Sequence, residues 1–190
     1  MPCRTERIIV PDGIQFEYLT PIDKMDSYPD AEEIPLLLDM HAEAKEYLSS
    51  HKWCTSIVES YLGYGVGKVI ALFLFRLDPP IKGTDEWLWV LVGDLPSAYF
   101  VIDEAPNPAE ALARYCELME DWANAVKEGK SLDDVYPVEA APTAEHAGML
   151  LSRVEFIRKN LIPTALEPPP SGDEDEESCE QQDAPAKESE

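Results

Sequence analysis

Trp87-Leu-Trp-Val-Leu-Val-Gly93 and Ala98-Tyr-Phe-Val-Ile102 are the two stretches that decide the fold of this chain. Both have the length of a β-strand, and only four residues connect them, which favours antiparallel neighbours. Pairing them symmetrically about the connection places Val92 opposite Tyr99 and Trp89 opposite Ile102. Both faces of the resulting hairpin are apolar, whereas an antiparallel sheet with one wet face alternates apolar and polar residues. The sequence therefore predicts a sheet that needs cover on both sides.

Two more strands are expected before this hairpin, at residues 55–62 and 68–77. The second of them is apolar on both faces as far as Arg76. Gly63-Tyr-Gly-Val-Gly67 separates the two and is typical of a flexible loop. Together the four strands predict an antiparallel β-meander.

Three helices are predicted around the sheet, over residues 30–50, 107–129 and 143–161. Asp30, Asn107 and Thr143 are capping residues that precede apolar stripes at helical spacing, and Gly129 is a stop signal. The fold class is therefore α+β. The helices either divide between the two faces of the sheet or stay on one side, with a second copy covering the other face in a homodimer. The pattern leaves both arrangements open.

The sequence divides into three parts. Residues 1–29 predict a small hairpin, with strands at 7–10 and 14–19, and a linker. Residues 30–166 form the α+β domain. Residues 167–190 hold ten acidic residues, one lysine and a run of three prolines, with no aromatic or branched apolar residue, and predict a disordered acidic tail.

Charge is the unusual property of the composition. The 190 residues carry a formal net charge of −23, of which −9 falls in residues 167–190 and −14 in the rest. This charge argues against binding to nucleic acid or to an anionic membrane, because both are polyanions. It is compatible with a protein partner, above all a basic one. No signal-type segment is expected, and four scattered cysteines predict reduced thiols and a cytoplasmic location.

The motifs of the sequence predict no cofactor and no metal. Gly67-Lys68 lacks the upstream glycine and the following hydroxyl residue of a phosphate-binding loop. His51 and Cys54 have the spacing of half a zinc site, but no second cluster of histidine or cysteine completes it. His41 lies on an apolar helical stripe and is expected to be a hydrogen-bonded core residue.

Four carboxylates form one candidate site. The hairpin pairing brings Asp85 and Glu86 to the same end of the sheet as Asp103 and Glu104. Such a cluster binds a divalent cation or raises the pKa of its own members for acid–base chemistry. A solvated acidic rim is the alternative interpretation.

Four apolar side chains form the other candidate site. Trp87 and Trp89 share a strand face with Phe100 and Ile102. They are expected in the core, or at a protein interface if that face is exposed in the monomer.

The segment from Asp85 to Tyr99, followed by Asn107-Pro-Ala-Glu-Ala-Leu112, resembles a family of uncharacterised bacterial proteins. The resemblance centres on residues 85–112. It implies a single domain from a bacterial cytoplasmic protein and carries over no catalytic residue.

Two functions follow as expectations. The first is a non-enzymatic, acidic protein-interaction domain, regulatory or similar to a bacterial immunity protein, since toxins that attack nucleic acid are often basic. The alternative is a small hydrolase or metal-dependent enzyme that uses the carboxylate cluster. The absence of a catalytic motif favours the first.

Overall fold

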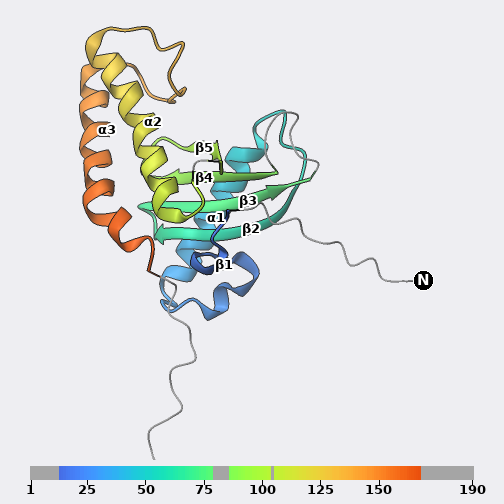
Figure 1. Cartoon of the computed structure of the whole chain (residues 1–190). Helices are drawn as coiled ribbons and strands as arrows, with labels where there is room; N and C mark the ends of the chain where they lie inside the picture. Colours follow the sequence, from blue (N-terminus) through green and yellow to red (C-terminus); the bar gives the residue numbers. More distant parts are fainter. Residues whose placement is uncertain (1–12, 79–85, 104, 168–190) are drawn as a thin grey trace, which may run out of the picture.

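The computed structural model describes residues 13–78, 86–103 and 105–167, and it confirms the α+β class (Figure 1). Its centre is an antiparallel sheet of five strands in sequence order, one more than expected. The additional strand, β1, has only two residues and pairs with β2 at the edge. The strands are β1 (Thr20–Pro21), β2 (Ile57–Val66), β3 (Ile70–Leu77), β4 (Trp87–Gly93) and β5 (Ala98–Val101).

The helices of the chain itself cover both faces of the sheet (Figure 1). Helix α1 (Glu33–Ser49) packs on one face, while α2 (Pro108–Glu128) and α3 (Ala144–Phe156) pack on the other. Successive residues of β3 and β4 alternate between the two cores, as the period of a strand requires. Ile70, Leu72, Leu74, Trp87, Trp89 and Leu91 belong to the core under α2 and α3, and Ala71, Phe73, Phe75, Leu88, Val90 and Val92 to the core under α1.

The predicted capping residues begin α2 and α3, and Gly129 ends α2. Helix α1 instead begins at Glu33, three residues after the predicted start at Asp30, with Glu32 at its N-cap position. The Asn107 side chain accepts a hydrogen bond from the Glu110 amide at 3.0 Å, and Gly129 ends α2 in the left-handed conformation. Thr143 accepts from the His146 amide at 3.2 Å and begins α3, which continues into a π-helical turn over Ile157–Leu161. Asp30 accepts from the Glu32 amide at 3.0 Å and orients the start of α1.

The predicted pairing of β4 with β5 is wrong by two residues. Trp89 lies opposite Phe100, and Val90 lies opposite Tyr99. A shift of two preserves the face to which each side chain points, so the assignment of side chains to the two cores remains correct.

The predicted glycine loop is also wrong. Gly63–Val66 belongs to β2, and the turn to β3 is confined to residues 67–69. These glycines serve close packing within a strand. A Cβ on Gly65 would overlap the Leu37 side chain of α1, and one on Gly63 would lie 2.8 Å from Trp89. The pairing of β2 with β3 shifts between Leu62 and Tyr64, which places a bulge at Gly63.

The described part of residues 1–29 is packed onto the domain. Residues 14–19, expected as a hairpin strand, contain a 3₁₀ turn at Phe16–Tyr18, and the expected linker forms β1 and a second 3₁₀ segment at Ile22–Ser27. Leu19 and Met25 are buried, one in each core. The other expected hairpin strand, residues 7–10, lies outside the described residues, as does the acidic tail apart from Glu167.

Within the described ranges, every helix is too short or too polar to cross a lipid bilayer.

Gly93 is the position where a small change should cost most stability. It has a φ of 138°, and a Cβ there would overlap the Val69 carbonyl oxygen. We expect Gly93→Ala to lower the free energy of unfolding by about 3 kcal/mol or more, since the backbone itself must move. Gly129→Ala is the matched control, because Gly129 also has positive φ but open space around it; its cost should be about 1 kcal/mol. Urea unfolding measures both, and equal losses would contradict the steric argument.

Candidate functional site: a groove at the edge of the sheet

The outer edge of β2 is only partly paired. Strand β1 covers Tyr61 and Leu62, and 3₁₀ segments on either side of β1 turn the chain away from the sheet. Pro21, which ends β1, also has no amide hydrogen with which to extend the ladder. Among the described residues, no strand therefore lies beside Gly63–Val66 on this side.

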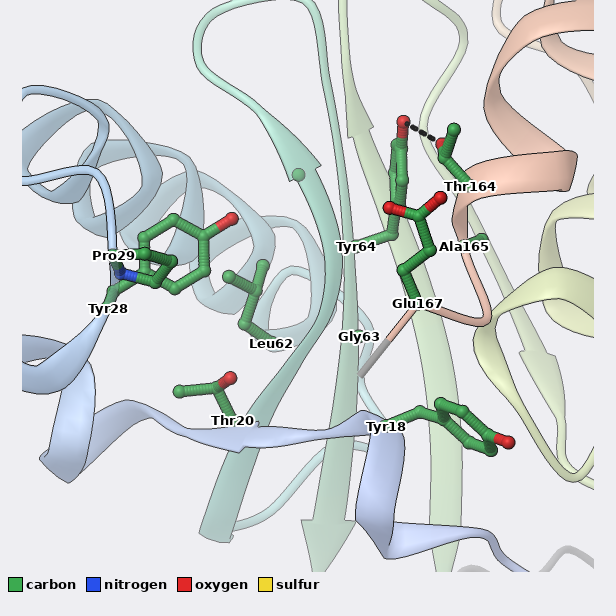
Figure 2. Close-up of a pocket in the computed structure, with 11 residues that line it drawn as sticks. Tyr18, Thr20, Tyr28, Pro29, Leu62, Gly63, Tyr64, Thr164, Ala165 and Glu167 are labelled. Atoms are coloured by element: carbon green, nitrogen blue, oxygen red, sulfur yellow. Dashed lines mark hydrogen bonds between the residues drawn. The ribbon is translucent and has the colours of Figure 1, made fainter. Parts of the chain in front are cut away.

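A groove of about 240 Å³ follows this unpaired stretch (Figure 2). Its floor is β2, and Thr20 of β1 lies at one end together with Tyr18. Tyr28 and Pro29 stand on one side of the strand and Tyr64, Thr164 and Glu167 on the other (Figure 2). The two walls come from opposite layers of the fold, since Tyr28 packs against the α1 core and Tyr64 against the α2/α3 core.

Hydroxyl groups hold one wall in place. The Thr164 hydroxyl donates to the Leu161 carbonyl oxygen at 2.9 Å. It therefore accepts from the Tyr64 hydroxyl, which lies 3.1 Å away and 100 positions earlier in the sequence (Figure 2). This pair ties the segment after α3 to the edge strand.

The electrostatic character of the groove is acidic. Glu167 is among its lining residues, and no lysine or arginine is among the described residues that line it. The pKa of the Tyr28 hydroxyl is raised, first by burial and then by the negative charge of Glu33 and by Tyr64 and Asp30. Glu33 also accepts a 2.6 Å hydrogen bond from the Gly67 amide at the end of β2. One carboxylate thus lines a groove of hydroxyl and backbone groups, and two more, Glu33 and Asp30, act on its Tyr28 hydroxyl, which suits a cationic ligand.

The same edge is hollowed on the other side of β1. A second cavity of about 590 Å³ is lined by Pro21–Lys24 and by Val58–Tyr61. Val58 is 47% exposed there. The charged residues that line this second cavity are of both signs: Asp23 and Glu59 are acidic, and Lys24 is basic.

The opposite edge of the sheet is closed differently. The outward-facing amide of Tyr99 in β5 donates to the Tyr136 hydroxyl at 3.0 Å. Tyr136 belongs to the segment between α2 and α3 and packs edge-to-face on Tyr99. A tyrosine hydroxyl therefore takes the place of a neighbouring strand at that amide.

The four candidate interface residues lie inside the domain. Trp87 and Trp89 have no exposed surface, and Phe100 and Ile102 are 9% and 7% exposed. All four belong to the core under α2 and α3. The Trp89 indole nitrogen donates to the Ala105 carbonyl oxygen at 2.8 Å. These four residues were expected at an interface only if their face of the sheet was exposed in the monomer. In the structure, α2 and α3 of the same chain cover that face.

The carboxylate candidates are only partly described. Glu86 accepts from Arg76 Nε at 2.5 Å, and Arg76 also binds Glu59 at 2.6 Å. Asp103 is exposed, while Asp85 and Glu104 lie outside the described residues. No group of three or more histidine, cysteine or carboxylate side chains within the described ranges is arranged to hold a metal ion.

His41 is half-buried, as expected of a hydrogen-bonded core histidine. Its Nε2 lies 3.0 Å from the Ser60 hydroxyl, and its ring stacks on Phe75. His51 contacts the rings of Tyr47, Trp53 and Tyr99 in a partly exposed aromatic cluster at the end of α1. Both histidines therefore have aromatic and hydrogen-bonding partners that account for their positions.

The groove residues Tyr18, Tyr28 and Tyr64 were not predicted from the sequence. The signal closest to them was the pair Tyr61 and Tyr64, since aromatic residues favour strands and predict that β2 continues through the glycines. Nothing in the sequence places Thr164 next to Tyr64.

No family model, no curated protein and no solved structure matches this chain.

Acidification should destabilise the fold through His41. Its pKa is lowered to about 4, first by burial and then by Lys45. Because the unfolded chain then binds a proton more readily than the folded one, stability is complete above pH 6.5 and falls as the pH drops toward 4. Between pH 7 and pH 5, wild type should lose about 1 kcal/mol more than His41→Gln in urea unfolding, because solvent screens the half-buried ring and reduces the full effect of the shift. His146→Gln, at an exposed position, should behave like wild type; an unchanged pH dependence in His41→Gln would contradict the assignment.

Proposed function

We propose that this protein is a non-catalytic interaction domain that binds a basic segment of another protein in the groove beside β2. The single observation that carries the proposal is the groove itself: an unpaired strand edge, hydroxyl walls, the Glu167 carboxylate and no cationic lining among the described residues. A protein similar to an immunity protein, which captures a basic toxin, is one form of this function.

The overall charge supports a basic partner. Residues 1–166 alone carry −14, so a cationic partner is attracted before contact, and the groove offers acceptors for its lysine or arginine side chains. Nucleic acid and anionic lipid would be repelled by the same field.

The enzyme alternative has weaker support. A general acid or base needs a carboxylate that is free to exchange protons, and the Glu86 carboxylate is already bound by the Arg76 guanidinium. A homodimer was considered because one apolar face of the sheet could lack cover. That reason no longer applies, since α1 covers one face and α2 and α3 cover the other.

A peptide selection tests the proposal. We expect random twelve-residue peptides displayed on phage, selected against the full chain, to be enriched in lysine and arginine. Binding of the enriched synthetic peptides should weaken as salt rises from 50 to 500 mM in calorimetric titrations, because added ions screen charges at the surface.

Two charge reversals locate the binding site. Glu167→Lys should weaken the selected peptides by about tenfold, since an attractive charge becomes a repulsive one. Glu43→Lys changes the net charge equally at an exposed position on α1 outside the groove and should have a smaller effect. Equal effects of the two variants, salt-independent binding or no enrichment at all would each contradict the proposal.

A further inference from the structure

We propose that the partner's segment binds as an added β-strand, hydrogen-bonded to β2 at Gly63–Val66 and in line with β1. This inference rests on the proposed function and specifies how the groove recognises its ligand.

The backbone of β2 is the first reason. Alternate residues of a strand direct their amide and carbonyl groups to the same side, so a strand with one neighbour offers unpaired groups on its other side. Strand β3 pairs with Tyr64, Gly65 and Val66 on the inner side, while β1 stops opposite Leu62 on the outer side. Gly63, Tyr64 and Gly65 line the groove, where an incoming backbone can reach their outward groups.

The position of β1 supplies the register. Thr20 lies opposite Leu62, and the chain before it turns away at the Phe16–Tyr18 3₁₀ segment. An added strand would take the place that the chain leaves vacant there. Four residues of β2 have no outer neighbour among the described residues, so the pairing would extend over about 13 Å, at roughly 3.3 Å per residue.

The walls predict an alternating side-chain pattern. Side chains of an added strand point in turn to the two faces of the sheet. One set would meet Tyr28 and Pro29, beside the buried Leu62 side chain, and the other would meet Tyr64, Thr164 and Glu167 (Figure 2). An apolar residue suits the first set, and a lysine or arginine suits the second because of the Glu167 carboxylate.

Charge also decides between the possible occupants. A second copy would bring another chain of net charge −23 to an acidic groove. Residues 168–190 of the same chain begin with three prolines, which have no amide hydrogen to donate, and continue with five consecutive acidic residues. A basic segment of another protein is free of both disadvantages, and we therefore assign the groove to it.

The test uses an end-blocked hexapeptide of alternating lysine and valine and two N-methylated versions of it. One version is methylated on the three lysine amides and the other on the three valine amides. Only one of these sets of amides can face β2, so one version should bind at least about tenfold more weakly than the parent, while the other keeps most of the affinity. NMR titration of the full chain measures all three affinities, and the parent peptide should slow hydrogen exchange at alternate amides within Gly63–Val66.

Each other outcome has a definite meaning. Equal affinity of the two methylated versions would overturn strand addition, and so would failure of the parent hexapeptide to bind at millimolar concentration. In both cases the phage-selected peptides and the Glu167→Lys variant decide separately whether the groove binds basic segments in another way. Concentration-dependent dimerisation of the full chain that protects Gly63–Val66 would assign the edge to a second copy and overturn the inference.

Discussion

The whole structure depends on one constraint, which is that β3 and β4 are apolar on both faces. Phe73 and Phe75 point to one side of the sheet, and Leu72 and Leu74 point to the other. Leaving either face in water would expose several large side chains, at roughly 25 cal/mol for each Å² of apolar surface. The chain meets this constraint by placing α1 on one side and α2 with α3 on the other. The fold is therefore a three-layer arrangement around a short antiparallel sheet.

Covering both faces leaves only the edges of the sheet for backbone recognition. At the β5 edge, the Tyr136 hydroxyl occupies the Tyr99 amide. At the β2 edge, β1 is limited to two residues by the 3₁₀ segments on either side of it. The groove exists because Tyr28 and Pro29, which precede α1, and the segment after α3 stand on opposite sides of β2 without meeting over its edge. The position of the candidate site thus follows from where the two helical layers end relative to the edge of β2.

Local chemistry made most of the fold predictable. Helix α2 begins after Asn107 and ends at Gly129 as expected, because a capping side chain and a left-handed glycine act on their immediate neighbours. Alternation along Trp87–Val92 assigned side chains to the correct faces, although the β4–β5 register was wrong by two residues, since a symmetric pairing about the connection ignores the geometry of its turn. The glycines of β2 led to the wrong prediction of a loop, because their role depends on contacts with Leu37 and Trp89, which lie far from them in the sequence. The groove could not be predicted for the same reason: Tyr28, Tyr64 and Thr164 come together only when the layers pack.

The difference between the two edges also limits how molecules of this protein can assemble. A sheet with two open edges can accept a strand on each side and so grow without end, which is the route to fibres. Here the β5 edge is short, and the Tyr136 hydroxyl already satisfies its outward amide at Tyr99. A strand added at the β2 edge would therefore find no equally open edge at β5, which disfavours growth from both sides of the sheet. The Tyr136 contact thus makes the two edges unequal: one outward amide of β5 is already bonded, whereas Gly63–Val66 of β2 has no neighbouring strand on its outer side among the described residues.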